Sequence, residues 1–221
     1  MAKPRKGLDS LHIIFLSFIA ILAVLLIYFV RNIHPIYTDE VVEVVDGDTF
    51  FIKNRQPIRL FGINAPEIGD CFSEESKTAL TKLILNKKVQ LTDLQADRYG
   101  RVLAMVHVDG KLINLEMIKG GFAVYVRAPD QYLETMKQAG SVARDQKIGI
   151  FTPFCYQPTP PDPKCKIKGN HDEKSQTAKV YFKPSCAYYD SVVVEKYLGE
   201  QWFCTEAEAV AAGYIKSPNC K

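Results

Sequence analysis

Two aspartates, an arginine and a glutamate suited to phosphate chemistry lie within a short stretch of this chain. Asp46 and Asp48 stand on a turn between two apolar runs, Arg59 lies inside a third run, and Glu67 follows a break at residues 64–66. Paired carboxylates can supply the oxygen ligands that a hard cation such as Ca²⁺ binds. A guanidinium fits phosphate oxygens, and a carboxylate on a stiff turn can act as a general base. The combination predicts hydrolysis of a phosphodiester.

Each of these residues also has a purely structural interpretation. Asp-Gly-Asp is a good turn sequence, Arg59 is compatible with a structural ion pair to Glu67, and Glu67 is compatible with a surface position. A second motif, D-R-Y-G-R at residues 97–101, favours the chemical interpretation because it brings two more arginines to the start of a strand. A second arginine on the same phosphate would stabilise a pentacoordinate transition state.

Short β-branched and aromatic runs predict the strands that would position these residues. We expect strands at residues 41–45, 50–52, 58–63, 88–92 and 101–108, and an extended run at 122–126. Helical spacing predicts helices at 73–85 with Ser73 as N-cap, at 112–119, and from Asp130 to about residue 147. This order predicts an α+β fold, a five-stranded OB-type Greek-key β-barrel with three helices. The fold alone is no evidence of function.

Four motifs in this order resemble the staphylococcal nuclease (thermonuclease) family over residues 41–151. They are V-D-G-D-T, R-L-x-G-x-N-A-P-E, D-R-Y-G-R and D-G-K-x-x-N. The resemblance implies a Ca²⁺-dependent nuclease that cleaves DNA and RNA and leaves 3′-phosphate ends. It implies a general base at Glu67 and transition-state stabilisation by Arg59 and Arg101. The other implied site residues are the metal ligands Asp48, Asn64 and the Ala65 backbone carbonyl, the outer-shell Asp46, and the substrate-binding Arg98, Tyr99, Tyr125 and Arg127.

The sequence departs from the family pattern at three of these positions. Asn64 replaces a second calcium aspartate and would coordinate without a charge, which predicts weaker calcium binding. Ala65 replaces a threonine that contributes only its carbonyl. Arg127 replaces a tyrosine, and its guanidinium can still stack on a base or pair with a phosphate.

The first thirty residues have the pattern of an export segment. Residues 11–30 contain no charged side chain and reach the about 20 residues that a helical membrane span needs. Lys3, Arg5 and Lys6 precede them, which places the N-terminus in the cytoplasm by the positive-inside rule. A cleaved signal peptide is the alternative, although no A-x-A-like site follows Val30. Either way, we expect the rest of the chain outside the cytoplasm, on the cell membrane or secreted.

The C-terminal part is rich in cysteine and aromatic residues, and a Pro-rich stretch precedes it. Outside the cytoplasm an even number of cysteines favours disulfides over zinc, and no C-x-x-C pair is present. We predict the pairs Cys71–Cys155, Cys165–Cys204 and Cys186–Cys220, and a helix at 206–212. The module resembles one appended to bacterial nucleases and surface proteins, and faintly a zinc module of a DNA repair protein. Its lysines form either a solvated surface or a further binding site: Lys164, Lys166, Lys168 and Lys174.

These observations divide the chain into six parts. They are a basic N-terminus (residues 1–10), a transmembrane signal-anchor (11–30), a spacer (31–39), a nuclease domain (40–154), a linker (155–164) and a small Cys-containing module (165–221). Net charge is only +3, so it argues neither for nor against nucleic-acid binding. A catalytically weakened binding or scaffold protein on the same barrel is the alternative function. Retention of Arg59, Glu67 and Arg101 favours the enzyme. We expect DNA and RNA as its partners. We also expect a monomer with no obligate protein partner.

Overall fold

The computed structural model describes residues 10–31, 37–171 and 179–220, which belong to two compact units, Met1–Ile36 and Tyr37–Lys221. Helix α1 (Ser10–Arg31) forms the described part of the first unit. Within the described residues, no helix is both long and apolar enough to cross a membrane. This finding does not support the transmembrane helix predicted at residues 11–30.

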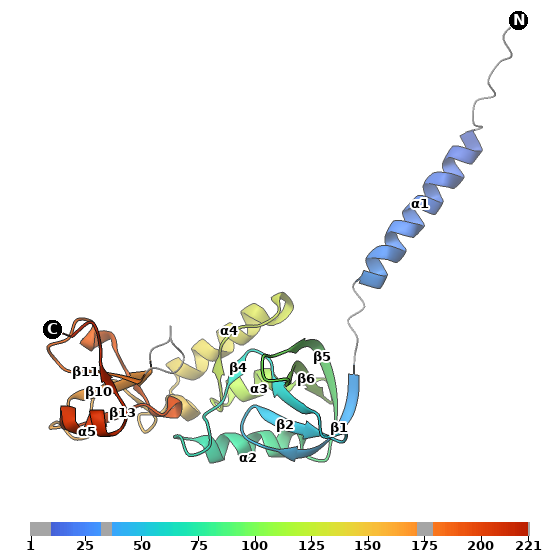
Figure 1. Ribbon diagram of the computed structural model, residues 1–221. Helices are drawn as coiled ribbons and strands as arrows, with labels where there is room; N and C mark the ends of the chain where they lie inside the picture. Colours follow the sequence, from blue (N-terminus) through green and yellow to red (C-terminus); the bar gives the residue numbers. More distant parts are fainter. Residues whose placement is uncertain (1–9, 32–36, 172–178, 221) are drawn as a thin grey trace, which may run out of the picture. The chain divides into compact units, whose positions relative to one another are not determined.

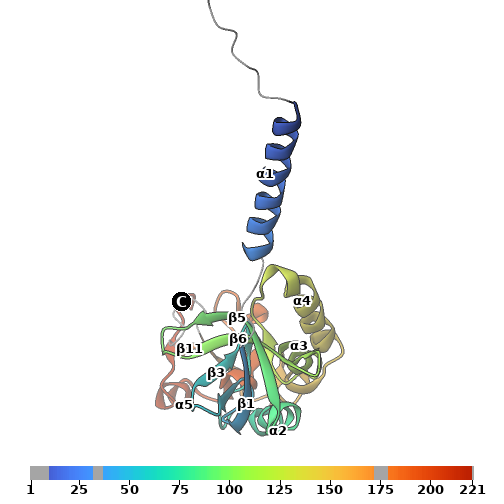
Figure 2. The ribbon, with the colours of Figure 1, turned by 90° about the vertical axis from the view of Figure 1, so that its right-hand side faces the viewer.

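A closed five-stranded barrel forms the larger part of the second unit. Its strands are β1 (Tyr37–Val44), β2 (Thr49–Ile52), β3 (Pro57–Leu60), β5 (Lys88–Ala96) and β6 (Val102–Val108). They pair in the order β3-β2-β1-β5-β6, and a parallel pairing of β3 with β6 closes the barrel. Figure 1 labels β1, β2, β5 and β6, and Figure 2 labels β3 beside β6. The predicted OB-type barrel is thereby confirmed.

A local irregularity in β5 explains why the predicted end of this strand was wrong. Strand β5 continues to Ala96, past the predicted end at residue 92, because its pairing with β6 resumes after a bulge between Thr92 and Gln95. Asp93 has a φ of 52° at this bulge. A bulge re-aims the strand without ending it, so polar residues here follow no alternating pattern.

Three helices cover the barrel, as predicted, and shorter elements complete it. The helices are α2 (Ser73–Ile84), α3 (Ile113–Lys119) and α4 (Asp130–Asp145), with α3 packed against both α2 and α4 (Figure 2). Ser73 is the first helical residue and not the N-cap, which is Phe72 at a φ of 73°. The shorter elements are β4 (Ile63–Asn64), which pairs with β8 (Val124–Tyr125), β7 (Lys111–Leu112) and the 3₁₀ turn Gly149–Phe151.

A buried asparagine fastens the chain that follows β3. Asn114 has no exposed surface, and its Nδ2 donates to the carbonyls of Phe61 (2.9 Å) and Ala104 (3.1 Å). Its Oδ1 accepts from the Val106 N–H at 2.9 Å. Since buried backbone groups need partners, this one amide fixes the end of β3 against β6. Arg59, one residue before the end of β3, is positioned by this connection.

The C-terminal module is built on a four-stranded sheet in the order β13-β10-β11-β14. These strands are β10 (Ile167–His171), β11 (Lys179–Phe182), β13 (Gln201–Phe203) and β14 (Ile215–Lys216). Helix α5 (Glu206–Ala211) confirms the predicted helix and begins with a capping box between Thr205 and Glu208. Two 3₁₀ turns complete the module, at Tyr189–Ser191 and Lys196–Leu198.

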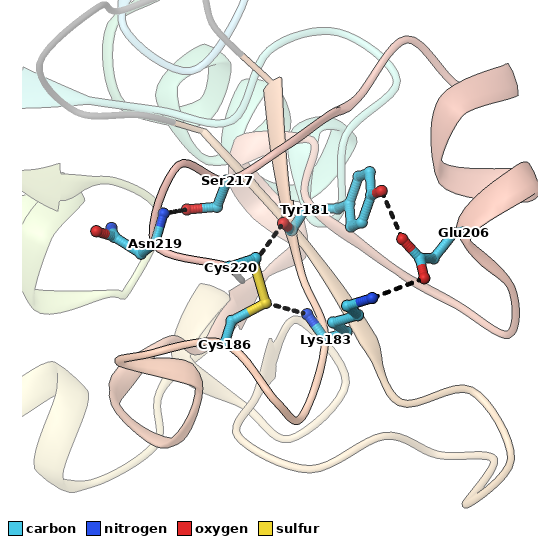
Figure 3. Close-up of a disulfide and its surroundings, with 7 residues drawn as sticks. All are labelled: Tyr181, Lys183, Cys186, Glu206, Ser217, Asn219 and Cys220. Carbon is cyan, nitrogen blue, oxygen red and sulfur yellow. Dashed lines mark hydrogen bonds and ion pairs between the residues drawn. A yellow bond between two sulfur atoms is a disulfide. The ribbon is translucent and has the colours of Figure 1, made fainter.

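All six cysteines form disulfides, in the three predicted pairs Cys71–Cys155, Cys165–Cys204 and Cys186–Cys220. Figure 3 shows the last pair beside an ion-paired cluster in which Glu206 accepts from Tyr181 Oη (2.7 Å) and Lys183 Nζ (3.0 Å). A module of this size buries little apolar surface, so covalent cross-links are expected to contribute much of its stability.

The stretch predicted as a linker packs against the rest of the second unit. Cys155 is fully buried, and β9 (Tyr156–Gln157) pairs with β12 (Val194–Glu195) of the module. The Phe151 and Tyr197 rings meet edge to face at 5.9 Å. The first residues of the predicted linker (155–164) therefore contact the rest of the second unit. The division of residues 40–221 into a nuclease domain, a linker and a module stays a prediction.

The lysines of the module do not share one exposed face. Lys168 is 3% exposed, and its Nζ donates to the carbonyls of Tyr189 (2.8 Å) and Val192 (2.5 Å). The same ammonium lies 4.2 Å from the centre of the Tyr189 ring. Lys168 therefore stabilises the module from inside, whereas Lys164 and Lys166 are exposed. Lys174 lies outside the described residues.

Candidate active site

The turn between β1 and β2 is both a tight turn and the base of the candidate site. Asp46 Oδ1 accepts from the backbone N–H groups of Asp48 (2.9 Å) and Thr49 (2.7 Å), which fastens the turn. A Cβ at Gly47 would lie 2.0 Å from Ser76 Oγ and 2.7 Å from Ala65 Cβ. The glycine thus lets the turn approach α2 and the Ala65 loop closely. The structural interpretation of Asp-Gly-Asp and a role in a site are therefore compatible.

Asp48 forms a buried ion pair at the centre of this arrangement. Its side chain is 2% exposed, its Oδ1 pairs with Arg59 Nη1, and its Oδ2 accepts from the Ala65 N–H at 3.0 Å. Thr49 Oγ1 donates to the same Oδ1 at 2.9 Å. Burial raises the pKa of Asp48, and the Arg59 charge acts in the opposite direction. The ion pair of Arg59 is thus to Asp48, not to Glu67.

Arg59 also contacts the second predicted metal ligand. Its Nη2 donates to Asn64 Oδ1 at 2.8 Å. Two oxygens, one from Asp48 and one from Asn64, therefore converge on a single cationic group. Oxygen atoms that converge in this way suit Ca²⁺, so the chemistry of these two ligands fits this ion. Only Asp48 carries a formal charge, since Asn64 contributes a neutral amide oxygen. No cluster of three His, Cys, Asp or Glu side chains suited to a metal occurs within the described residues.

Closure of the barrel brings the two predicted catalytic arginines to the same side. Arg59 pairs in register with Leu103 of β6, and Arg101 directly precedes that strand. Arg101 Nε donates to Asp97 Oδ2 at 2.7 Å. Desolvation acts to raise the pKa of Asp97, but hydrogen bonds from the side chain and backbone of Arg101 and from the Tyr99 N–H lower it below its ordinary value. Asp97 thus holds Arg101 in place as a charged partner.

Glu67 is exposed on the loop between β4 and α2. The Asp70 N–H donates to the Glu67 carbonyl at 2.9 Å, which forms a turn just after the glutamate. Cys71 then joins the loop to Cys155, and its N–H donates to the Lys196 carbonyl of the module at 3.3 Å. The loop of Glu67 is therefore held by Cys155, which follows the barrel and its helices, and by Lys196 of the module.

A cavity of about 1010 Å³ collects most of the predicted site residues. All three predicted catalytic residues line it, as do Asn64, Ala65, Arg98 and Arg127. Asp48 lies beneath this surface, joined to it through Arg59 and Ala65. The remaining predicted residues, Asp46, Tyr99 and Tyr125, do not line the cavity.

Aromatic rings hold the exposed arginines at the rim of the cavity. The guanidiniums of Arg98 and Arg101 lie 4.9 and 5.5 Å from the centre of the Tyr99 ring, which is 69% exposed. Arg127 lies 4.9 Å from the Phe61 ring. These contacts place three cations where a polyanion could reach them. Tyr125, by contrast, is half-buried on β8.

Some residues of the site were not predicted from the sequence. Thr49 orients Asp48, and Asp97 orients Arg101. The four-residue spacing of Asp97 and Arg101 in the sequence could have indicated the role of Asp97. Residues of the C-terminal module also line the cavity, among them Asn170, His171 and Lys179. No sequence pattern predicts this, because they reach the cavity only through tertiary packing.

Comparisons with known proteins agree with this geometry. The profile of the family described as "Staphylococcal nuclease homologue" matches residues 57–152. The chain is 34% identical to the "Micrococcal nuclease" of Shigella flexneri over 52% of its own length and 74% of that protein. It is 35% identical to an "Uncharacterized endonuclease" of Escherichia coli over 55% of its length and 80% of that protein. It is 42% identical to an "Uncharacterized endonuclease" of Haemophilus influenzae over 39% of its length and 51% of that protein.

The family profile covers the predicted catalytic residues but begins after the turn that carries Asp46 and Asp48. The chain spans about half the length of the Haemophilus relative and about three-quarters or more of the other two. Identity of 34% and 35% over 74% and 80% of the Shigella and Escherichia proteins shows common family membership. The closed barrel is consistent with this family. This chain belongs to the staphylococcal nuclease family.

Proposed function

We propose that this protein is a Ca²⁺-dependent nuclease that hydrolyses phosphodiester bonds of DNA and RNA. The observation that supports it most is that Arg59, Glu67 and Arg101 line a single cavity directly above the buried carboxylate of Asp48. An anion-binding cavity with a carboxylate at its edge suits attack of water on a phosphate. Family membership supports the same conclusion.

Each side chain has a distinct task in this proposal. Glu67, exposed at the cavity edge, takes the proton from the attacking water or orients it. Arg59 and Arg101 bind the equatorial phosphate oxygens and stabilise the charge that grows there. Arg98 and Arg127 bind neighbouring phosphates or bases, and the exposed ring of Tyr99 offers a face for stacking. By family resemblance, the bond to the 5′ oxygen breaks.

Asp48, Asn64 and the Ala65 carbonyl would hold Ca²⁺, with Asp46 in the outer shell. Bound there, the ion would supply a positive charge that polarises the phosphate. Since Arg59 pairs with both Asp48 and Asn64, the same guanidinium would have to release these two oxygens for Ca²⁺ to bind them. Asp48 is also held by Thr49 and the Ala65 N–H, so its position does not depend on Arg59 alone.

We further propose that the second unit functions outside the cytoplasm. The observation in favour is that all six cysteines are disulfide-bonded, and such bonds persist in oxidising compartments. The apolar segment at residues 11–30 would then be an export segment, retained as an anchor or removed.

The simplest test is cleavage of circular DNA, plasmid and single-stranded, by the purified protein. We expect loss of both circles with Ca²⁺, arrest by a chelator, and products with 3′-phosphate ends. The scaffold alternative predicts binding of the same DNA without cleavage at any calcium concentration. That result would overturn the proposed activity.

A further inference from the structure

The cavity that holds the candidate catalytic residues has a second wall, contributed by the C-terminal module. We call this the module wall and define it by its residues in the cavity: Asn170, His171, Lys179, Glu195, Tyr197, Leu198, Gly199 and Glu200. The wall closely approaches the loop of Glu67, because a Cβ at Gly199 would lie 3.2 Å from Asp70 Oδ1. A strand bound at Arg59 and Arg101 would therefore meet the module.

The acidic groups of the module wall already have partners. Glu195 accepts from Tyr197 Oη at 2.6 Å and pairs with Arg144 at 3.6 Å. Glu200 is 4% exposed and accepts from the backbone N–H groups of His171 (3.0 Å) and Glu195 (2.7 Å). Burial raises the pKa of Glu200 to about 7. These carboxylates therefore present little uncompensated negative charge to the cavity.

Lys179 is the exposed cation of the module wall. Its charge acts on both sides of the cavity. It opposes the effects of burial and of Glu67, which together raise the pKa of Asp70. It adds to the effect of burial in lowering the pKa of His171. The pKa of His171 is thus below its ordinary value, and Lys179 supplies the charge of this wall. The Lys179 ammonium lies 5.4 Å from the centre of the Tyr214 ring. An exposed ammonium has three donors that can bind phosphate oxygens.

From this arrangement we infer that the module wall is a second phosphate-binding subsite, where Lys179 binds the backbone of the nucleic-acid strand that enters or leaves the catalytic cavity. The inference rests on the proposed nuclease function for the identity of the strand. The cavity volume of about 1010 Å³ is at the upper end for ligand pockets, so it holds more than a single phosphodiester. The module would therefore extend the contact with substrate beyond the barrel.

Binding without cleavage tests this subsite independently of catalysis. All variants carry Glu67→Gln, and the chain binds a fluorescein-labelled short oligothymidylate in the presence of a chelator. We expect Lys179→Gln to raise Kd about tenfold at low salt, the loss of one charge-assisted hydrogen bond. The slope of log K against log salt should fall by about 0.7, the value for one phosphate contact on a single strand. Lys179→Arg should restore both quantities.

Lys164→Gln is the matched control, because Lys164 is an exposed lysine near the same module that does not line the catalytic cavity. It should change neither Kd nor the salt slope, and thermal melting of each variant shows whether it is folded. Equal Kd and slope for Lys179→Gln and Lys164→Gln would overturn the subsite. Absence of cleavage by the unmodified protein would overturn only the nuclease proposal, since the binding measurement does not depend on it.

Discussion

Removal of the Cys71–Cys155 disulfide should lower both stability and turnover, for separable reasons. The two cysteines are 84 residues apart, and a cross-link that closes a loop of this size restricts the unfolded chain by about 4.5 kcal/mol at 25 °C. For a unit of this size, each kcal/mol corresponds to about 2–4 °C in Tm. We therefore expect the Cys71→Ala/Cys155→Ala variant to melt about 10–18 °C lower.

The effect on turnover follows from the place of this bond in the site. Cys71 is four residues after Glu67, and its bond to the fully buried Cys155 fixes this loop to the segment that follows α4. A shift of about 1 Å in a catalytic group can cost about 100-fold in rate. We expect kcat to fall about 10- to 100-fold at a temperature where the variant is fully folded.

The matched control is Cys186→Ala/Cys220→Ala, which removes a bond between residues 34 apart. Its entropic cost is similar, about 4 kcal/mol, but neither cysteine lies on the loop of Glu67. Thermal melting and steady-state turnover on single-stranded DNA measure the two effects. Equal turnover for both double variants, below their melting temperatures, would refute the claim that this bond positions Glu67.

Three further changes test individual residues of the account. Asp97→Asn should lower kcat about 10-fold or more, since Arg101 loses its ionic partner, and it should add nothing in an Arg101→Ala background when turnover of both is compared. Asn64→Asp should tighten Ca²⁺ binding about tenfold in a calorimetric titration, because it adds a carboxylate beside Asp48; unchanged affinity would exclude Asn64 as a ligand. Glu200→Gln should abolish a loss of stability that the unmodified protein shows as the pH rises from 4.5 to about 7.

The sign of the Glu200 effect follows from its raised pKa. Burial raises the pKa of Glu200 from 4.5 to about 7 in the folded protein. Between these values the folded state keeps a proton that the unfolded state has released, so stability decreases as the pH rises through this window. The full cost, about 3 kcal/mol, applies above pH 7 and vanishes below pH 4.5. Urea midpoints at pH 5 and pH 8, compared between unmodified protein and variant, isolate this contribution.

The barrel and the core of the site were predictable because their signals are local. The β-branched and aromatic runs around Val44 and Phe50 predicted strands, and the turn chemistry of Asp46 and Gly47 predicted the loop between them. The disulfide pairs, also predicted correctly, are cross-links between segments far apart in the sequence. Arg59 inside an apolar strand required a buried partner, and the structure supplies Asp48.

Features that depend on tertiary packing were missed for physical reasons. Lysine is usually a surface residue, but the ammonium of Lys168 donates to the carbonyls of Tyr189 and Val192 inside the module. The proline-rich stretch has no apolar period, yet Tyr156 pairs with the module through backbone hydrogen bonds. The module wall likewise brings Lys179 to the cavity through sheet packing. None of these arrangements leaves a periodic pattern in the sequence.

The central claim is that Glu67 acts as the base in a site formed with Arg59 and Arg101. The most direct test is the turnover of Glu67→Gln on single-stranded DNA at saturating Ca²⁺, with Glu74→Gln as control, since Glu74 is exposed on α2 outside the cavity. We expect the turnover of Glu67→Gln to fall about 100-fold or more at an unchanged melting temperature, and the turnover of the control to stay the same. Equal turnover of Glu67→Gln and the unmodified protein would contradict the central claim.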